Sequence, residues 1–271
     1  GTLSITPAAL TITATAKSKT YGDTLALNGA TDFISSGLQS GETIGSVTLA
    51  ASGSPAGTVA TAAAGAYAIT PSAATGGTFN PGNYTISYAS GVLTVNRAAL
   101  SITADAQTKV YGADDPALTV AYAGFVNGES ATVLGGTLVL SRAPGENVGN
   151  YLITPGGLTS ANYNLTFNTG TFNITKAVLT VAATARTKPY GAGDPTLTFT
   201  VGGLQFTDTQ ATVLTGALTR AAGETVAGSP YAITQGNLLP NGNYTIDFTG
   251  STLTISPVPL SITANAETKV Y

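Results

Sequence analysis

The sequence predicts an all-β protein made of three tandem β-sandwich repeats, each about eighty residues long. Three observations lead to this prediction. The same short segments recur along the chain at nearly constant spacing. Apolar and polar residues alternate within these segments, which is typical of half-buried strands. Turns rich in Gly, Pro, Asn and Asp separate the segments, and no long helical pattern interrupts them.

The repeat is clearest at the start of each unit, where a Leu-x-Ile/Val strand is followed by Lys-x-Tyr. The distance from Lys19 to Lys109 is 90 residues, and the next two steps are 79 and 81 residues. The recurring opening strands are Leu10–Ala14, Leu100–Ala104, Leu179–Ala183 and Leu260–Ala264. We therefore expect the closing strand of a preceding repeat at 1–6, repeats at 7–97, 98–176 and 177–257, and the opening strand of a following repeat at 258–271.

Within the middle repeat, period-two alternation predicts about six strands. The inward positions are Leu100, Ile102 and Ala104; Leu118, Val120 and Tyr122; Leu138 and Leu140; Tyr151 and Ile153; Tyr163, Leu165 and Phe167; and Phe172 and Ile174. The segments Glu129–Leu134 and Asp208–Leu214 begin with an acid and do not alternate, which predicts a short helical turn. The Ala/Gly-rich stretch Ser54–Gly65 of the first repeat predicts a loop insertion.

Six short strands at about ten-residue spacing favour an immunoglobulin-like sandwich. A β-grasp repeat, in which strands wrap around one helix, is the alternative. Junctions such as Asn96–Ala99 and Thr175–Val178 are short, and the junction Ser256–Pro259 contains two prolines, which stiffen it. The sequence therefore predicts an extended rod.

The composition excludes several classes of function. Charged residues make up 8% of the chain, against roughly 25% in an average soluble domain, and Lys and Arg do not cluster. We therefore expect no nucleic-acid partner and no membrane insertion in this segment. His and Cys are absent, so a His-based catalytic triad and thiolate chemistry are excluded. We expect neither an enzyme nor a bound cofactor or metal, and the Thr-rich strands favour a secreted protein.

Several recurring motifs together resemble one known family. They are Lys-x-Tyr-Gly, Gly128-Glu129 before Val133-Leu134, an Arg-x-x-Gly-Glu stretch, and Asn-Tyr near the close of each repeat. The stretch occurs at Arg142–Glu146 and Arg220–Glu224, and the first repeat lacks it. This set of motifs is similar to the MBG domain of the YGX type. The resemblance implies very large bacterial surface proteins, an extracellular location and a role in surface display, adhesion or filament building, with no catalytic residues to carry over.

Two alternatives remain open for the recurring lysines, asparagines and acids. They could form autocatalytic Lys–Asn isopeptide bonds, which need a Lys, an Asn and a nearby carboxylate in an apolar core. Alternatively, they are a surface Lys, a turn Asn and an acid at a helix start. The candidate sets are Lys109, Asn162 and Glu129; Lys188, Asn243 and Asp208; and Lys19, Asn83 and Glu42.

The remaining candidate sites also have simpler structural interpretations. Asp114, Asp115 and Asp194 lie in turns that could gather calcium ligands, but their spacing matches no calcium loop. Tyr21, Tyr111 and Tyr190 could form aromatic surfaces for sugars, although packing with a bonded hydroxyl is the favoured interpretation. Asn-x-Thr sites for glycosylation occur at Asn83, Asn164, Asn173 and Asn243.

The sequence thus predicts a stalk or filament segment of a long secreted adhesin on the bacterial cell surface. Its partners would be the neighbouring repeats of the same chain. One alternative is a module that binds cell-surface glycans or mucin, by analogy with mucus-binding repeats. Another is a self-assembling extracellular fibre in which copies of the chain pair with one another. The even spread of aromatic residues favours the stalk.

Overall fold

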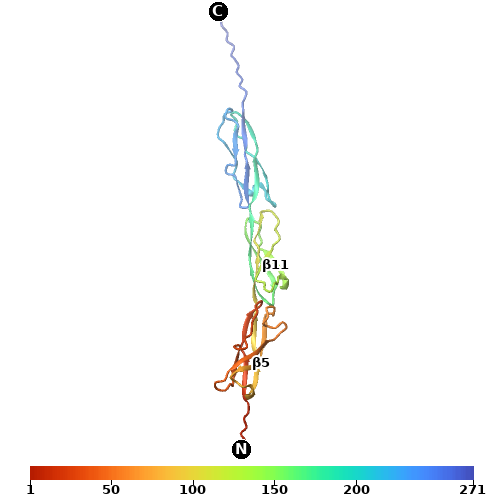
Figure 1. Ribbon diagram of the computed structural model, residues 1–271. Helices are drawn as coiled ribbons and strands as arrows, with labels where there is room; N and C mark the ends of the chain where they lie inside the picture. Colours follow the sequence, from red (N-terminus) through yellow and green to blue (C-terminus); the bar gives the residue numbers. More distant parts are fainter. The chain divides into compact units, whose positions relative to one another are not determined.

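Strands make up nearly all the regular structure in the computed structural model, which describes residues 1–271 (Figure 1). The first repeat contains β1 (Ala8–Ala14), β2 (Lys17–Thr20), β3 (Phe33–Ser36), β4 (Ile44–Ala51), β5 (Gly65–Gly77), the 3₁₀ turn η1 (Pro81–Asn83), β6 (Tyr84–Ala89) and β7 (Gly91–Asn96). The second contains β8 (Ala98–Ala104), β9 (Gln107–Val110), β10 (Val120–Ala123), the 3₁₀ turn η2 (Ala131–Val133), β11 (Gly135–Arg142), β12 (Gly149–Thr159), β13 (Tyr163–Asn168) and β14 (Gly170–Thr175).

The third repeat follows the same order with shorter outer strands. It contains β15 (Ala177–Ala183), β16 (Arg186–Pro189), β17 (Phe199–Gly202), the helical turn α1 (Gln210–Val213), β18 (Leu214–Thr215), β19 (Thr219–Arg220), β20 (Tyr231–Thr234), β21 (Leu239–Pro240), β22 (Tyr244–Thr249) and β23 (Ser251–Ser256). The turns η2 and α1 lie inside the two segments for which the sequence predicts a short helical turn, so that prediction is confirmed.

Each repeat is built around two extended segments that run parallel to each other. In the first repeat, one segment contains β1 and β2, and the other contains β6 and β7. There, β1 pairs with β6 and β2 pairs with β7, and the residue offset between partners is the same in both ladders. Antiparallel strands complete two sheets, in the orders β3-β1-β6 and β2-β7-β5-β4. The equivalent sheets are β10-β8-β13 and β11-β12-β14-β9 in the second repeat, and β17-β15-β22 and β16-β23-β20-β19 in the third.

The predicted all-β repeats are therefore confirmed, with two sheets in each. Their strand order differs from the ABED and CFG sheets of an immunoglobulin domain, because the first and last strands lie side by side in both sheets. The helix of the β-grasp alternative is reduced to the single turns η2 and α1.

The predicted strands of the second repeat need one correction. The strand β9 was not predicted, because its inward residue is the charged Lys109 and the apolar alternation is lost there. Residues 1–6 and 258–271 form no strand within this chain, and their assignment to flanking repeats stays a prediction. A strand needs a hydrogen-bonding neighbour, and no other segment of the chain pairs with either terminus.

The chain divides into two compact units, and the boundary runs through the second repeat. The first unit holds 1–105, 118–141 and 153–170, and the second holds 106–117, 142–152 and 171–271. Within the first unit, one buried cluster contains residues of two repeats, with Tyr21 and Leu93 from the first and Leu100 and Tyr163 from the second. Successive repeats therefore share a packed core at this junction.

Candidate functional site

A half-buried carboxylate joins two tyrosines from successive repeats at the first junction. Tyr21, directly after β2, donates a hydrogen bond from its hydroxyl to Glu129 of the second repeat. Tyr163, at the start of β13, donates to the other oxygen of Glu129 at 2.5 Å. The two tyrosine rings meet edge to face, with centroids 5.5 Å apart. We call this arrangement the tyrosine clasp.

The second junction repeats the tyrosine clasp with Tyr111, Asp208 and Tyr244. The hydroxyls of Tyr111 and Tyr244 donate to the Oδ2 atom of Asp208 at 3.1 and 2.6 Å. The two rings are again edge to face, at 5.3 Å. Phe206 adds a second edge-to-face contact to Tyr111, also at 5.3 Å. The same three groups therefore meet at both junctions, with a Glu in one and an Asp in the other.

The acid of each clasp is held by a short loop that begins with a glycine. Gly124 has a φ of +115°, and a Cβ there would lie 2.4 Å from the carbonyl oxygen of Ala99. The backbone N–H of Val126 donates to the Tyr163 hydroxyl at 3.1 Å, and that of Gln205 donates to the Tyr244 hydroxyl at 2.9 Å. Each of these hydroxyls therefore accepts one hydrogen bond and donates another, which fixes its orientation.

The asparagine before each second tyrosine adds a further bond across the junction. The side-chain oxygen of Asn162 accepts from the backbone N–H of Ala64 in the first repeat, at 3.0 Å. The oxygen of Asn243 accepts from the N–H of Val148 in the second repeat, also at 3.0 Å. Side chain and backbone thus both tie each repeat to the next.

Burial and the clasp carboxylate together keep the tyrosines protonated. Burial first, and then the hydrogen bond to Glu129, raises the pKa of Tyr163 to about 12. The same two causes, with Asp208 as the acceptor, raise the pKa of Tyr244 to about 12. The pKa values of Tyr21 and Tyr111 are also raised, with burial as the largest cause. All four phenols therefore remain hydrogen-bond donors well above neutral pH.

Half of a clasp is present at each end of the set of repeats. Tyr84 donates to Glu42 and accepts from the N–H of Gln39, as the equivalent groups do in the other repeats. In the third repeat, Tyr190 takes the position of Tyr21 and Tyr111 but is 53% exposed. It lines a cavity of about 410 Å³ with Thr225, Val226, Pro257 and Val258.

A second recurring group is a cluster of four charges in each of the second and third repeats. Lys109 contacts Asp115 at 2.6 Å and Glu146 at 2.5 Å, and Arg142 contacts the same two carboxylates at 2.6 and 2.5 Å. The guanidinium of Arg142 also lies 4.9 Å from the ring centroid of Phe172. Lys188, Asp194, Arg220 and Glu224 repeat the pattern.

These contacts lower the pKa values of the carboxyl groups. Arg220 first, and then Lys188, lowers the pKa of Asp194 to about 2. The equivalent contacts lower the pKa of Asp115, with Lys109 as the largest cause. The first repeat has no such cluster. There, Lys19 donates to the backbone carbonyls of Asp23 and Val59, and burial lowers its pKa.

The residues of the suggested isopeptide bonds have other partners in the structure. The Lys109 and Lys188 ammonium groups contact carboxylates of the four-charge clusters. Asn162 and Asn243 bond to the preceding repeat, and Glu129 and Asp208 hold the clasp tyrosines. In these two sets the acid and the asparagine thus lie together at the junction, while the lysine is bound elsewhere. In the third set, Lys19 bonds to backbone carbonyls and Glu42 accepts from Tyr84.

The other predicted sites are placed as follows. Tyr21 and Tyr111 are buried, at 4% and 6% exposure, and only Tyr190 is open to solvent. Asp115 and Asp194 pair with Lys and Arg, and Asp114 is exposed. No group of three or more His, Cys, Asp or Glu residues is placed to hold a metal ion. Among the Asn-x-Thr sites, Asn83 and Asn164 are exposed, whereas Asn173 and Asn243 are partly buried.

The sequence analysis did not identify the clasps or the four-charge clusters as units. Tyr21 and Glu129 are 108 residues apart, and each clasp joins residues of two different repeats. The equal recurrence of Lys-x-Tyr, the acid and Asn-Tyr was the available signal. It would have identified the clasp only if partners had been sought in the neighbouring repeat.

No helix in the structure has the length and apolar character needed to cross a membrane. No curated protein sequence matches the chain. Among solved structures, the crystal structure of Drosophila N-cadherin EC1-4 matches at 8% identity, over 93% of this chain and 76% of that one. Its TM-score is 0.26, and a similarity this low carries no argument.

Comparison with protein families gives three matches to one family, at residues 10–94, 100–173 and 179–254. Each match contains one of the three structural repeats, with its parallel pair of long strands. Because the three matches cover most of its length, the chain belongs to the MBG domain (YGX type) family.

Proposed function

We propose that this chain is a non-catalytic stalk segment of a long secreted adhesin on the bacterial cell surface. The observation that carries this proposal is the tyrosine clasp, in which two tyrosines bond to one carboxylate at both junctions. A clasp of this kind resists bending, because the junction can open only by breaking part-buried hydrogen bonds and separating packed rings. Junctions of this kind would keep a stalk stiff and extended.

The connections between repeats support the same role. A single residue, Arg97, separates β7 from β8, and Lys176 alone separates β14 from β15. A repeat cannot turn far on a linker of this length. The strands β8 and β9 together run from Ala98 to Val110. This segment spans roughly 40 Å at about 3.3 Å per residue, so three repeats in line would reach on the order of 120 Å.

Small-angle X-ray scattering of the whole chain tests the proposal. A rod of that length has a radius of gyration of about 35 Å. A compact particle of the same chain length would have one of about 18 Å. We expect a value near the first figure, and a shorter pair-distance distribution after Tyr21 and Tyr111 are both changed to Ala. A value near 18 Å for the unaltered chain would contradict the stalk.

The half-clasps support self-assembly into a fibre as a second candidate function. Tyr190 offers a donor, and Glu42 with Tyr84 offers an acceptor, so one chain could follow another head to tail. Light scattering would then show a mass that rises with concentration, and Tyr190→Ala would abolish the rise. A constant monomer mass across the concentration series would rule this candidate out.

A further inference from the structure

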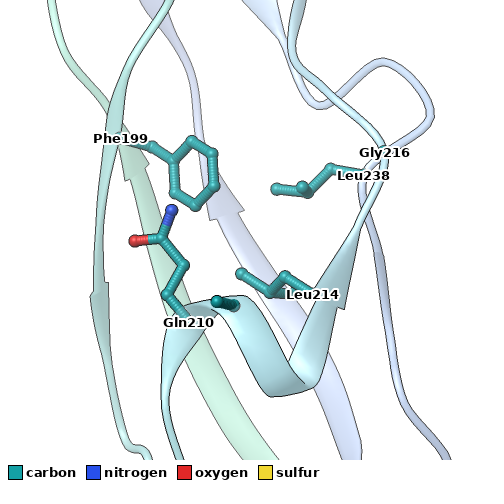
Figure 2. Close-up of a pocket in the computed structure, with 6 residues that line it drawn as sticks. Phe199, Gln210, Leu214, Gly216 and Leu238 are labelled. Carbon is teal, nitrogen blue, oxygen red and sulfur yellow. The ribbon is translucent and has the colours of Figure 1, made fainter.

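The third repeat has a cavity whose walls differ from the equivalent segments of the second repeat. It has a volume of about 290 Å³ and lies between β17, α1 and the β18–β21 ladder. Figure 2 shows the Phe199 ring, Leu214 and Leu238 directed into this space, with the Gln210 side chain beside the ring. Ala211 and Gly216 complete the lining.

One wall of the cavity contains a residue that the second repeat lacks. In the second repeat, one residue, Ser130, separates Glu129 from Ala131, and η2 is a 3₁₀ turn. In the third, Gln210 is inserted between Asp208 and the matching Ala211, and the turn becomes the α-helical turn α1. The additional residue enlarges the turn and places an amide at the rim.

The opposite wall is also specific to the third repeat. The strand β12 runs unbroken from Gly149 to Thr159, whereas its counterpart is divided into β20 and β21. The break is held in place: the Asn237 side chain accepts from Ala217 N–H at 2.8 Å, and Gln235 donates to Leu238 O at 2.8 Å. The cavity wall is therefore preformed, as in most small-molecule sites.

The lining determines the kind of ligand. None of its six residues carries a charge, so an ionised ligand would lose its hydration without compensation. The face of an aromatic ring and two leucines suit an apolar surface. The exposed Gln210 amide offers one acceptor and two donors at the edge. A pyranose ring combines these features, since its C–H groups form an apolar face and its hydroxyls surround the edge.

We propose that this cavity binds a single neutral pyranose unit, such as an uncharged sugar at the end of a glycan. The Phe199 ring would lie against the C–H face of the sugar, and Gln210 would bond to adjacent hydroxyls. The volume is near the lower limit of small-molecule pockets, which fits one ring and excludes an oligosaccharide. This role is independent of the stalk role, because it uses no residue of the tyrosine clasps.

Nuclear magnetic resonance titration of the ¹⁵N-labelled chain with neutral monosaccharides tests the proposal. A ligand of this size in an open site binds with a dissociation constant in the millimolar range. We expect saturable shifts of the Phe199, Gln210 and Leu238 amides with at least one hexose or N-acetylhexosamine. Glycerol at the same concentration should leave these amides unshifted.

Two matched variants separate the site from general effects. Ala211→Leu fills the cavity from an exposed position and should abolish the shifts. Ala131→Leu makes the same change at the equivalent exposed position of η2, where no Gln is inserted, and should leave binding intact. Gln210→Ala should weaken binding about tenfold or more, because it removes the edge hydrogen bonds. Shifts that persist in Ala211→Leu, or that are absent with every neutral sugar, would overturn the proposal.

Discussion

The three equivalent tyrosines offer an internal comparison of the tyrosine clasp. Tyr21 and Tyr111 are in complete clasps, whereas Tyr190 has the same position in its repeat and is exposed. Changing each to Phe removes the hydroxyl and keeps the ring. The ring contacts at 5.3 to 5.5 Å should survive, so each variant tests the hydrogen bond to the carboxylate.

The expected magnitude follows from the contacts at each position. A hydrogen bond to a charged group contributes about 1.5 to 3 kcal/mol. Glu129 and Asp208 each keep a second tyrosine as donor, so the lower half of that range applies. We expect Tyr21→Phe and Tyr111→Phe to lower the free energy of unfolding by about 1.5 to 2 kcal/mol each. Tyr190→Phe should stay within about 0.5 kcal/mol, as exposed substitutions do.

Urea denaturation followed by far-ultraviolet circular dichroism gives the global stability, since the chain has no Trp. Tandem repeats need not unfold in one step, so a local measurement is also required. Hydrogen exchange of the segment around Gln205, whose N–H bonds to Tyr244, should be about tenfold faster in Tyr111→Phe. The same segment should be unaffected by Tyr21→Phe. Equal losses at Tyr111 and Tyr190 would refute the clasp as a stabilising unit.

Three further predictions concern pH and backbone geometry. Because the folded-state pKa of Tyr163 and Tyr244 is about 12, against 10.0 for a free phenol, their contribution is complete below pH 10. This contribution should be lost as the pH rises through 12. Urea midpoints measured across this pH range should therefore fall less in the double variant Tyr163→Phe, Tyr244→Phe than in the unaltered chain. For Asp194, with its folded-state pKa near 2, the contribution is present above about pH 4 and lost as the pH falls toward 2. Acid titration of Asp194→Asn should lack that loss, whereas the exposed Asp114→Asn should retain it. Gly124→Ala should lower the free energy of unfolding by about 2 kcal/mol or more, because its Cβ would meet the Ala99 carbonyl at a positive φ. Gly193→Ala, with open space around it, should lower the free energy by less than about 0.5 kcal/mol. Thermal melting of the two variants checks this.

The sequence was sufficient to predict the repeats, most strands and the helical turns, because these features depend on local patterns. The alternation Leu100, Ile102, Ala104 corresponds directly to the buried face of β8. The pairing of the first strand with the last is non-local, and nothing in the alternation distinguishes a parallel from an antiparallel neighbour. Strand order was therefore the part of the fold that could not be derived.

The candidate site was predictable in its residues but not in its chemistry. The recurrence of an acid, an asparagine and a lysine indicated a shared role, and a cross-link within one repeat was a natural hypothesis. The structure instead places the acid and asparagine against the preceding repeat, and pairs the lysine with carboxylates. Recurrence shows that positions matter, but in a tandem protein it does not show whether their partners lie within a repeat or in the next one.

The differences among the repeats indicate which interactions the array requires. The four-charge cluster is present in the second and third repeats, yet in the first Lys19 bonds only to backbone carbonyls, one of them from the inserted loop. Stability within a repeat can therefore be reached in more than one way. The clasp differs much less between the junctions. The first has Glu129 and Asn127 where the second has Asp208 and Phe206, but two tyrosines and one carboxylate meet at both. An array that only linked independent domains would not need the same tyrosine clasp at both junctions. An array in which each repeat must fix the orientation of the next would depend on these junctions.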